Sequence, residues 1–377
     1  MIYFDSAATT FRKPHAVGQA MLRSMERCAS PGRGGYRAAM EAAETVYACR
    51  EQCAGLFDCA PEQVVFTFNA THGLNLAIKS MVGPGDRVVV SGFEHNAVMR
   101  PLTALGADVV IAGRTLFDPA DTLENFQRAL ERPARAVVCT HVSNVFGYAL
   151  PLAQIAMLCR ERQVPLIVDA SQSAGVLPLS LRRLQAAFIA MPGHKSLYGP
   201  QGTGVLLCGV MPKKTVLEGG TGSVSRELSM PEFLPDRLEA GTSNVTGIAG
   251  LGAGLQFVAS QRPERLAAGE SRLCRLLADG LAQMDGVRVF RGGNQVGVLS
   301  FQAAGMDCEE VARRLAAHDI AVRAGLQCAP CAHESAGTLE DGTIRVSFSA
   351  FSAEAEVRQF IQVMREINTT IKKETPH

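Results

Sequence analysis

The stretch Phe188-Ile189-Ala190-Met191-Pro192-Gly193-His194-Lys195 joins a short apolar run to a glycine and a lysine. Six similar runs occur in the sequence, each apolar throughout rather than alternating with polar residues: 64–68, 87–91, 108–111, 136–140, 166–169 and 204–207. Such runs are typical of strands buried on both faces of a mostly parallel sheet with crossover helices, for which 75–81 and 152–162 are candidates. The pattern therefore predicts an α/β fold with a large, seven-stranded, mostly parallel sheet.

The length and the later sequence predict a second, smaller domain. A chain of 377 residues is too long for one simple core. Glycine and serine become frequent at 241–254, where a long helical pattern begins. We therefore expect a large domain at 15–250 and a smaller α+β domain at 1–14 and 251–377. The strands predicted for the smaller domain lie at 297–301 and 343–348, and its helices at 309–317 and 354–371.

Composition narrows the class of partner. The 37 basic and 36 acidic residues give a net charge of +1, and no long basic run suggests binding to nucleic acid or to a membrane surface. The start of the chain lacks the pattern of a signal peptide, and no stretch approaches the length of a membrane helix. We therefore expect a cytoplasmic protein with a small-molecule substrate and with its eleven cysteines mostly reduced.

Polar residues follow several of the predicted strands, where ligands bind in parallel α/β sheets. Asp169 ends a very apolar run, so its buried carboxylate needs a cationic partner such as a pyridinium nitrogen. Lys195 provides an amine that can hold an aldehyde cofactor as a Schiff base. Taken singly, Asp169 is equally a helix cap and Lys195 a surface residue, but together they indicate pyridoxal phosphate chemistry.

Three further strand ends support the same site. Thr71 lies where a helix begins and can contact a phosphate, His95 can stack on a flat cofactor, and Asn144 ends another strand. Each has an ordinary alternative, as a helix cap, a surface histidine or a turn residue. Their value for the prediction is collective.

The chain resembles the class V branch of fold-type I pyridoxal phosphate enzymes, and within it the cysteine desulfurases. The motifs that carry the resemblance are A-T-H-G at 70–73, E-H-N-A-V at 94–98, V-D-A-S-Q-S-A-G at 168–175 and G-H-K-S-L-Y-G-P-Q-G-T-G at 193–204. The resemblance runs almost from end to end, from Tyr3 to Phe348.

The resemblance implies a role for each residue around the cofactor. Lys195 would form the Schiff base, Asp169 would pair with the pyridine nitrogen, and Gln172 would contact the ring hydroxyl. Further implied cofactor contacts come from His95, which stacks and is counted as catalytic, from Asn144 near the substrate, from Ala70, Thr71 and His194 at the phosphate, and from Thr242 of a second subunit. A homodimer is therefore implied. Pro192 stands where the family usually has a serine, which puts one phosphate hydrogen bond worth about 1.5–3 kcal/mol in doubt.

The reaction is indicated by the stretch 321–331, which contains Arg323-Ala324-Gly325-Leu326-Gln327-Cys328-Ala329. It resembles the pattern of group II desulfurases and selenocysteine lyases, in which the cysteine accepts sulfur. Cys328 would then take sulfur from L-cysteine as a persulfide, leaving L-alanine, while Arg345 binds the substrate carboxylate. Cys328 and Cys331 could instead form a redox pair or half of a metal site, although no second CxxC is present and no metal site is predicted.

Several alternatives stay open at this stage. A selenocysteine lyase or an aminotransferase would use Lys195, Asp169 and Arg345 in the same way, and Pro192 is compatible with a non-catalytic member. Arg33 matches an active-site loop and would line the entrance, although a surface arginine is the simpler role. The protein that accepts the sulfur is not identified by the sequence.

Overall fold

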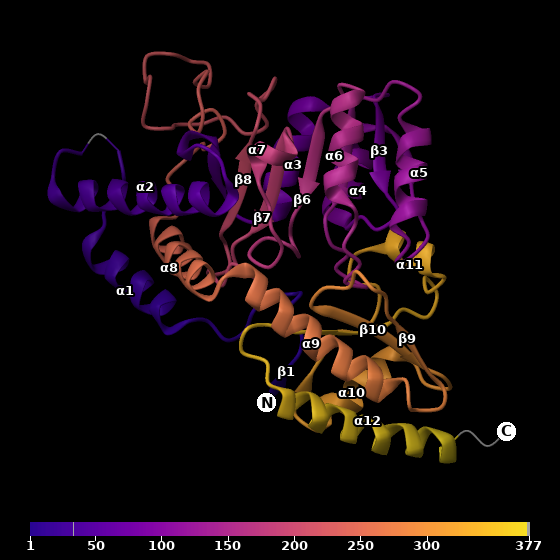
Figure 1. The fold of residues 1–377 in the computed structure, drawn as a ribbon. Coiled ribbons are helices and arrows are strands. Elements are labelled where there is room, and N and C mark those ends of the chain that lie inside the picture. Colours follow the sequence, from indigo (N-terminus) through magenta and orange to yellow (C-terminus); the bar gives the residue numbers. More distant parts are fainter. Residues whose placement is uncertain (33, 375–377) are drawn as a thin grey trace.

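The computed structural model describes residues 1–32 and 34–374, and its centre is a twisted seven-stranded sheet (Figure 1). In these residues the strand order is β2-β8-β7-β6-β5-β3-β4, and every neighbouring pair is parallel except the two that involve β8. The strands are β2 (Val64–Thr67), β3 (Arg87–Ser91), β4 (Asp108–Ala112), β5 (Ala136–Thr140), β6 (Leu166–Asp169), β7 (Phe188–Pro192) and β8 (Gly204–Cys208). The predicted α/β fold with a mostly parallel sheet is confirmed.

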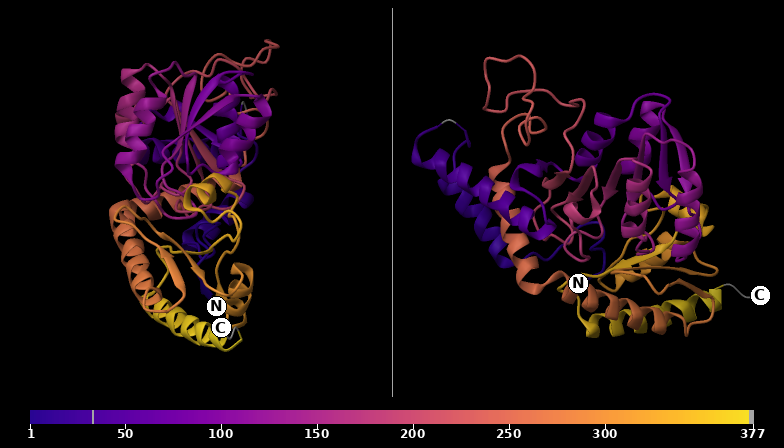
Figure 2. Two further views of the ribbon diagram at one scale, coloured as in Figure 1. Left: turned by 90° about the vertical axis from the view of Figure 1, so that its right-hand side faces the viewer. Right: turned by 45° about the horizontal axis from the view of Figure 1, so that its top comes forward.

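Helices cover both faces of this sheet, as the left view of Figure 2 shows. The helices α3 and α4 pack on one face, and α2, α5, α6 and α7 pack on the other. Their bounds are α2 (Arg37–Phe57), α3 (Ala70–Met81), α4 (Asn96–Leu105), α5 (Pro119–Ala129), α6 (Leu152–Glu161) and α7 (Leu181–Leu184), and a 3-10 turn (Pro61–Gln63) precedes β2. The runs in the sequence are apolar throughout because successive residues of a strand face opposite sides of the sheet, and each side is covered by a layer of helices.

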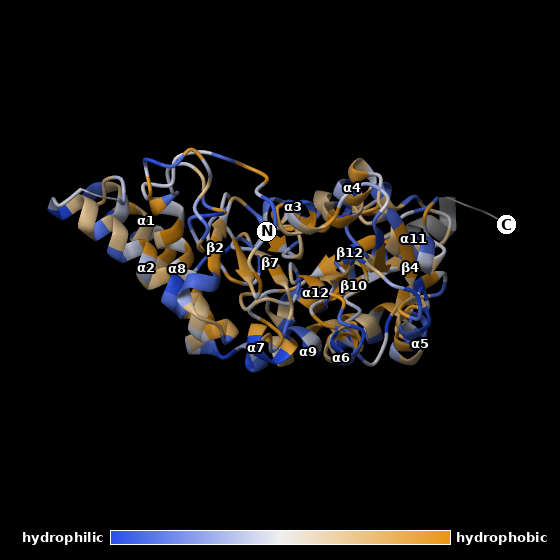
Figure 3. Cartoon of the chain, turned by 90° about the horizontal axis from the view of Figure 1, so that it is seen from above, coloured by the Kyte–Doolittle hydropathy of each residue, from blue (hydrophilic) through white to orange (hydrophobic). Residues whose placement is uncertain are grey.

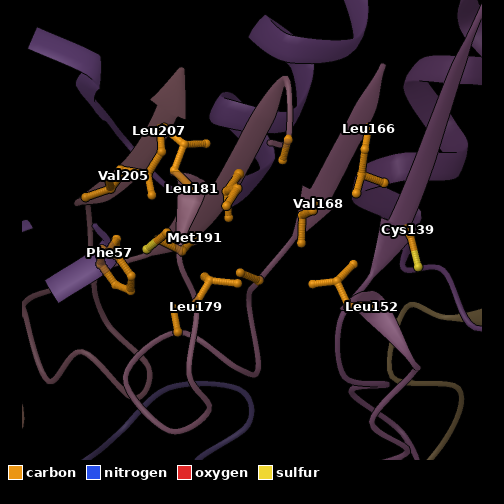
Figure 4. Packing of buried hydrophobic residues seen from close by; sticks show 14 of the residues in the cluster. Phe57, Cys139, Leu152, Leu166, Val168, Leu179, Leu181, Met191, Val205 and Leu207 are labelled. Carbon is orange, nitrogen blue, oxygen red and sulfur yellow. The ribbon is translucent and has the colours of Figure 1, made fainter. Parts of the chain in front are cut away.

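Strand β6 illustrates this double burial. Leu166 and Val168 point into one core, which Figure 4 shows together with side chains of α2, α6 and α7, while Ile167 packs into the core on the other face. All three side chains are at most 2% exposed. The hydropathy colouring of Figure 3 shows the same layering, with orange strands inside and blue residues on outer loops and helix surfaces.

A smaller antiparallel sheet lies below the large one in Figure 1 and packs against three helices. Its strand order is β12-β10-β9, and the first strand of the chain, β1, pairs with β11 beside it. The elements are β1 (Ile2–Tyr3), β9 (Val287–Phe290), β10 (Val298–Ala303), β11 (Ile320–Ala321), β12 (Ile344–Ser347), α9 (Pro263–Leu281), α10 (Cys308–Ala317) and α12 (Glu354–Glu374). The short helix α11 (Pro330–Ala336) lies between β11 and β12 in the sequence.

Helix α8 (Val245–Gln261) connects the two parts and packs against α2 and the preceding helix α1 (His15–Arg27). The boundary that we place after residue 250 falls inside α8, and the division into domains stays a prediction. None of the helices in the described ranges is both long and apolar enough to span a membrane.

The amino-terminal segment links the small sheet to the loop that carries Lys195. Phe4 is fully buried beside the small sheet, and a few residues later the Thr10 N–H and hydroxyl both donate to the His194 carbonyl at 3.0 Å. The hydroxyl of Thr9 and the ammonium of Lys13 donate to the same oxygen at 3.2 and 3.1 Å. The backbone next to Lys195 is therefore fixed by a part of the chain nearly 200 residues away in sequence.

Gly193 allows this loop to pass close to β8, and we expect Gly193→Ala to lower the melting temperature by several degrees. A Cβ at this position would lie 2.1 Å from the Thr203 hydroxyl oxygen, which itself donates to the Pro200 carbonyl at 2.7 Å. Overpacking of this kind costs about 1–3 kcal/mol. The double variant Gly193→Ala/Thr203→Ala should melt above Gly193→Ala alone because the clashing oxygen is gone. A double variant that melts lower still would contradict this explanation.

Candidate active site

The predicted site residues meet at the carboxyl ends of the central strands. Asp169 is the last residue of β6 and lies between Thr140 of β5 and Ala190 of β7. It is 2% exposed, and its Oδ1 atom accepts hydrogen bonds from the backbone N–H and the hydroxyl of Ser171. This arrangement caps the turn after β6 and also places a buried carboxylate at the sheet edge.

Lys195 follows β7 and lies in the electrostatic field of the Asp169 carboxylate. Burial lowers the pKa of its ammonium from 10.5 to about 8, an effect that Asp169 opposes and Arg345 reinforces. An amine with such a pKa is partly neutral near physiological pH, which is what nucleophilic attack on a carbonyl requires.

His95 contributes a flat, neutral ring to the same site. It precedes helix α4, and its Nδ1 accepts a hydrogen bond from the Ala97 N–H at 3.0 Å, so the ring proton of the neutral form lies on Nε2. Burial lowers the pKa of His95, and the charges of Asp169 and Lys195 both act on the ring. The three predicted residues are thus brought together.

The residues predicted at the phosphate lie around the start of helix α3. Thr71 is exposed in its first turn, Ala70 is 7% exposed, and the side chain of Asn69 caps the helix by accepting the His72 N–H at 2.9 Å. His194 lies in the loop after β7 and has a buried Nδ1 without a hydrogen-bond partner among the described residues. Burial, reinforced by Lys195, lowers the pKa of His194 to about 4, so the ring is neutral.

Thr242 lies in an exposed loop before α8 and lines a small pocket together with His72 and Phe68. Phe68 and His72 stack with their ring centroids 4.7 Å apart. In one copy of the chain, then, Thr242 lies near the start of α3. Its predicted contact with a second subunit is not visible in a single chain.

Cys328 is exposed at the tip of a tight turn that is fastened to the site. Gln327 and Cys328 both have positive φ angles, of 44° and 58°, and the Ala329 N–H donates to the Leu326 carbonyl at 2.9 Å, as in a type I′ turn. Such turns favour glycine, and each other residue in this conformation costs about 1–2 kcal/mol.

Hydrogen bonds from the large sheet and the small sheet hold this turn in place. The Asn144 amide donates to the Gln327 carbonyl at 2.9 Å, and the Asn96 N–H donates to the Cys328 carbonyl at 2.8 Å. The side chain of Gln327 donates to the Thr343 carbonyl at 3.0 Å. Asn144 and the start of α4 therefore bring Cys328 to the edge where Asp169, His95 and Lys195 lie.

Arg345, the predicted substrate arginine, is 3% exposed in β12. Its Nη2 donates to Asp5 at 2.7 Å and its Nη1 donates to the Asn144 carbonyl at 3.1 Å, while Nε is buried without a partner in the described part of the chain. Arg323 binds the other oxygen of Asp5 at 2.7 Å. Asp5 thus pairs with both arginines, of which Arg345 also contacts Asn144.

Some functional contacts were not anticipated from the sequence. The Gln172 amide donates to the Ala7 carbonyl at 3.0 Å, so one of its two N–H groups is already used. Asp5 and Gln327 had no recognisable signal, whereas Glu94 directly precedes His95 in the E-H-N-A-V motif. Arg33 lies outside the described residues.

Glu94 is a fully buried carboxylic acid beneath the site. Its Oε1 accepts hydrogen bonds from the Thr140 N–H at 2.8 Å and from the Ser91 hydroxyl, and its Oε2 has no partner among the described residues. Burial, and secondarily the charge of Asp169, raises the pKa of Glu94 to about 8. The group is therefore largely protonated at neutral pH.

The donor set fits an aldehyde-bearing aromatic cofactor with an anionic group. Lys195 offers an amine of lowered pKa, and Asp169 offers a carboxylate that can pair with a protonated ring nitrogen. The unpartnered Nδ1 of His194 and the amino-terminal end of α3 offer hydrogen-bonding groups for an anion.

Comparison with known proteins gives matches along nearly the whole chain. A family model described as aminotransferase class-V matches residues 2–360. A "Probable cysteine desulfurase" of Methanothermobacter thermautotrophicus is 30% identical over 97% of this chain and 94% of that protein. A "Cysteine desulfurase" of Escherichia coli O157:H7 is 32% identical over 87% of this chain and 84% of its own length.

Solved structures of similar proteins share the fold. The apo structure of a cysteine desulfurase from Thermococcus onnurineus matches with a TM-score of 0.87 and 28% identity, over 98% of this chain and 95% of that one. The cysteine desulfurase CsdA of Escherichia coli, solved with an S-sulfonic acid, matches with a TM-score of 0.83 and 28% identity, over 97% and 94% of the two chains.

The buried Glu94 predicts a pH-dependent difference in stability between the wild type and Glu94→Gln. The pKa of Glu94 is about 8 in the folded state and 4.5 for the free side chain, so between these values the unfolded chain loses a proton that the folded chain keeps. Raising the pH across this range therefore disfavours the folded wild type. The glutamine variant lacks this titration.

We expect the melting temperature of the wild type, measured relative to Glu94→Gln, to fall as the pH rises from about 5 to about 8. Glu62→Gln, which changes an exposed carboxylate, is the matched control and should give a difference that varies little with pH. A pH-independent difference for Glu94→Gln would show that Glu94 is ionised in the folded protein.

Proposed function

The chain belongs to the aminotransferase class V family, and we propose that it is a pyridoxal phosphate-dependent cysteine desulfurase that passes sulfur to Cys328. The observation that carries the proposal is the attachment of the Cys328 turn to the sheet edge that holds Lys195 and Asp169. Asn144 makes this attachment and simultaneously contacts Arg345 through its carbonyl. These contacts support a site in which an exposed thiol, an amine and a carboxylate-binding cation act on one substrate.

The residues around Lys195 support binding of pyridoxal phosphate. When bound, the cofactor supplies an aldehyde for attachment to an amine and a ring that withdraws electrons from the substrate Cα. Lys195 would hold it through its amine and Asp169 would pair with its ring nitrogen, with His95 beside the ring. Ala70, Thr71 and His194 would hold the phosphate, and Gln172 would offer its second N–H to the ring hydroxyl.

Arg345 binds the carboxylate of L-cysteine. Its Nη groups already contact Asp5 and the Asn144 carbonyl, which fixes the guanidinium plane, and the buried Nε still lacks a partner in the described chain. A substrate carboxylate would satisfy Nε and would be held at a charge that cannot be lost. Asn144, whose carbonyl accepts from Arg345, donates its side-chain amide to the Gln327 carbonyl next to Cys328.

Lys195 and Cys328 then act in turn. The Lys195 amine would remove the proton from the substrate Cα, a step for which a pKa of about 8 is well matched. The Sγ atom of Cys328 attacks the substrate sulfur, and the substrate Cβ–S bond breaks. The bonding electron pair stays with the carbon skeleton, Cβ takes up the proton that the Cys328 thiol gives up, and Lys195 returns a proton to Cα to give L-alanine. The sulfur remains on Cys328 as a persulfide.

A homodimer is supported by apolar side chains that are exposed on α1 and α2. These residues are between 51% and 61% exposed: Leu22, Met25, Met40 and Tyr47. In Figure 1, α1 and the amino-terminal part of α2 project to one side of the molecule, whereas the other end of α2 reaches the large sheet. In such a dimer the loop with Thr242 reaches the phosphate of the other subunit. A cytoplasmic location and an acceptor protein for the sulfur stay predictions.

Two variants separate cofactor attachment from sulfur transfer. Lys195→Ala should lose the visible absorbance of the bound cofactor and the formation of alanine, whereas Cys328→Ala should keep the absorbance and lose at least tenfold in sulfide and alanine formation from L-cysteine. Lys79→Ala, which removes a lysine at the end of α3, is the control and should match the wild type.

The outcome with Cys328→Ala decides between related activities. Full turnover of L-cysteine by this variant would overturn the persulfide mechanism. If the wild type as well as Cys328→Ala turned over L-selenocysteine but not L-cysteine, the activity would be that of a selenocysteine lyase, because selenium leaves more readily than sulfur and does not require the thiol. Formation of a keto acid instead of alanine would indicate an aminotransferase.

The role of Thr242 between subunits is tested by mixing two inactive or weakened variants. Thr242→Ala should weaken cofactor binding by about tenfold, the effect of one lost charge-assisted hydrogen bond. If Thr242 serves the opposite subunit, a mixed dimer of Lys195→Ala and Thr242→Ala contains one complete site, and activity at low cofactor concentration should exceed that of either parent. A mixture no more active than its parents would place Thr242 in its own subunit's site.

A further inference from the structure

Cys328 and Cys331 form a Cys-Ala-Pro-Cys sequence of which the mechanism above uses only the first thiol. The two thiols differ sharply in environment. Cys328 is exposed in the turn, whereas Cys331 is 7% exposed at the second position of α11, behind Ala329 and Pro330. The pair therefore combines one thiol open to substrate with one that is shielded from solvent.

The two cysteines are three positions apart in a segment of the chain that is folded back on itself. The turn reverses the chain at Gln327 and Cys328, and α11 starts two residues later. The side chain of Gln327 then meets that of His333 at 3.0 Å, and His333 Nδ1 is in turn 2.7 Å from the Thr338 hydroxyl. Both cysteines lie inside the short segment closed by the Gln327–His333 contact.

Cys331 faces the interior beneath the site rather than bulk solvent. Burial raises the pKa of its thiol, and the carboxyl groups of Glu334 and Glu94 add to this effect while Arg114 opposes it. Among the cysteines of the described chain, Cys328 is the exposed one, so it is the thiol at which sulfur chemistry begins. The short tether makes Cys328 the natural reaction partner of Cys331.

We propose that Cys331 resolves the persulfide on Cys328, an inference that rests on the proposed desulfurase function. The sulfur of Cys331 attacks Sγ of Cys328, the bond between Sγ and the terminal sulfur breaks, and a Cys328–Cys331 disulfide forms. The terminal sulfur leaves with the bonding electron pair and takes the proton of the Cys331 thiol, so it departs as hydrogen sulfide. A dithiol reductant then restores both thiols for the next turnover.

The consequence is that sulfur can leave the enzyme without an acceptor protein docking at the turn. In a site with Cys328 alone, the persulfide persists until an external thiol attacks it. Here the first equivalent of sulfide is released by the protein itself. What must then be supplied from outside is a pair of electrons, delivered to the disulfide.

The test is a single turnover of the holoenzyme with L-cysteine in the absence of reductant. Trypsin releases residues 324–345 as one peptide that contains both cysteines and no others. In the wild type we expect about one sulfide per alanine and a peptide about 2 Da lighter than the dithiol form. In Cys331→Ser we expect the same alanine, at least tenfold less sulfide, and a peptide about 32 Da heavier.

Two controls make the result specific to Cys331. Cys28→Ser changes a partly buried cysteine at the end of α1 and should behave as the wild type. Circular dichroism and cofactor absorbance check that Cys331→Ser is folded, and Cys331→Ala replaces it if it is not. Treatment of the resting holoenzyme with diamide, a thiol oxidant, tests independently whether the two sulfurs can meet, and should give the lighter peptide in the wild type and in Cys28→Ser but not in Cys331→Ser.

The outcomes distinguish failure of this inference from failure of the proposed function. Alanine formation with a stable, heavier peptide in the wild type would overturn resolution by Cys331 while leaving the desulfurase intact. A diamide-treated wild type without a Cys328–Cys331 disulfide would overturn it as well. Absence of alanine from every protein would overturn the proposed function, and with it the persulfide that Cys331 is proposed to resolve.

Discussion

The contact between Asp5 and two arginines holds the parts of this molecule in register. Arg345 is buried, and a buried guanidinium is tolerated only when it is paired and hydrogen-bonded. Asp5 supplies the pairing from the amino-terminal segment, and the Asn144 carbonyl supplies a further acceptor from the loop after β5. One ionic cluster therefore joins the start of the chain, the small sheet and the edge of the large sheet. Removing one partner from such a buried pair costs about 3–5 kcal/mol.

Burial at the sheet edge also sets the charge of the reacting groups. It lowers the pKa of Lys195, His95 and His194, all of which become easier to hold in the neutral form, and it raises the pKa of Glu94. Asp169 provides a carboxylate among these neutral groups, and it accepts a hydrogen bond from the Ser171 N–H. A site organised in this way favours a cofactor that carries its own charges over a substrate bound by surface ion pairs.

Much of the fold was predictable because double burial leaves a strong trace in sequence. Strand β6 reads as a continuous apolar run since Ile167 faces one helical layer and Val168 the other. The same logic located Asp169 and Lys195, because the ends of parallel strands share an edge. Helices α1 and α2 were not predicted, and in α2 the exposed Met40 and Tyr47 blur the periodicity on which such a prediction depends.

The remaining site contacts depend on distant residues or on unusual backbone geometry. Asp5 and Arg345 are separated by 340 positions, so neither residue reveals the other in a single sequence. The turn at Gln327 and Cys328 is still harder to predict, because left-handed conformations are ordinarily signalled by glycine or asparagine, and neither residue is present here. The resemblance marked Cys328 as a sulfur acceptor, but it did not reveal that Asn144 and Asn96 fasten the turn.

That turn has a meaning for the evolution of the chain. Stability alone would favour glycine at position 327 and again at 328, since each left-handed non-glycine residue is unfavourable. Glycine at 327 would forfeit the contacts to Thr343 and His333, and glycine at 328 would remove the thiol. Relaxed selection would therefore be expected to show first as drift toward glycine at these two positions, well before the buried strands changed.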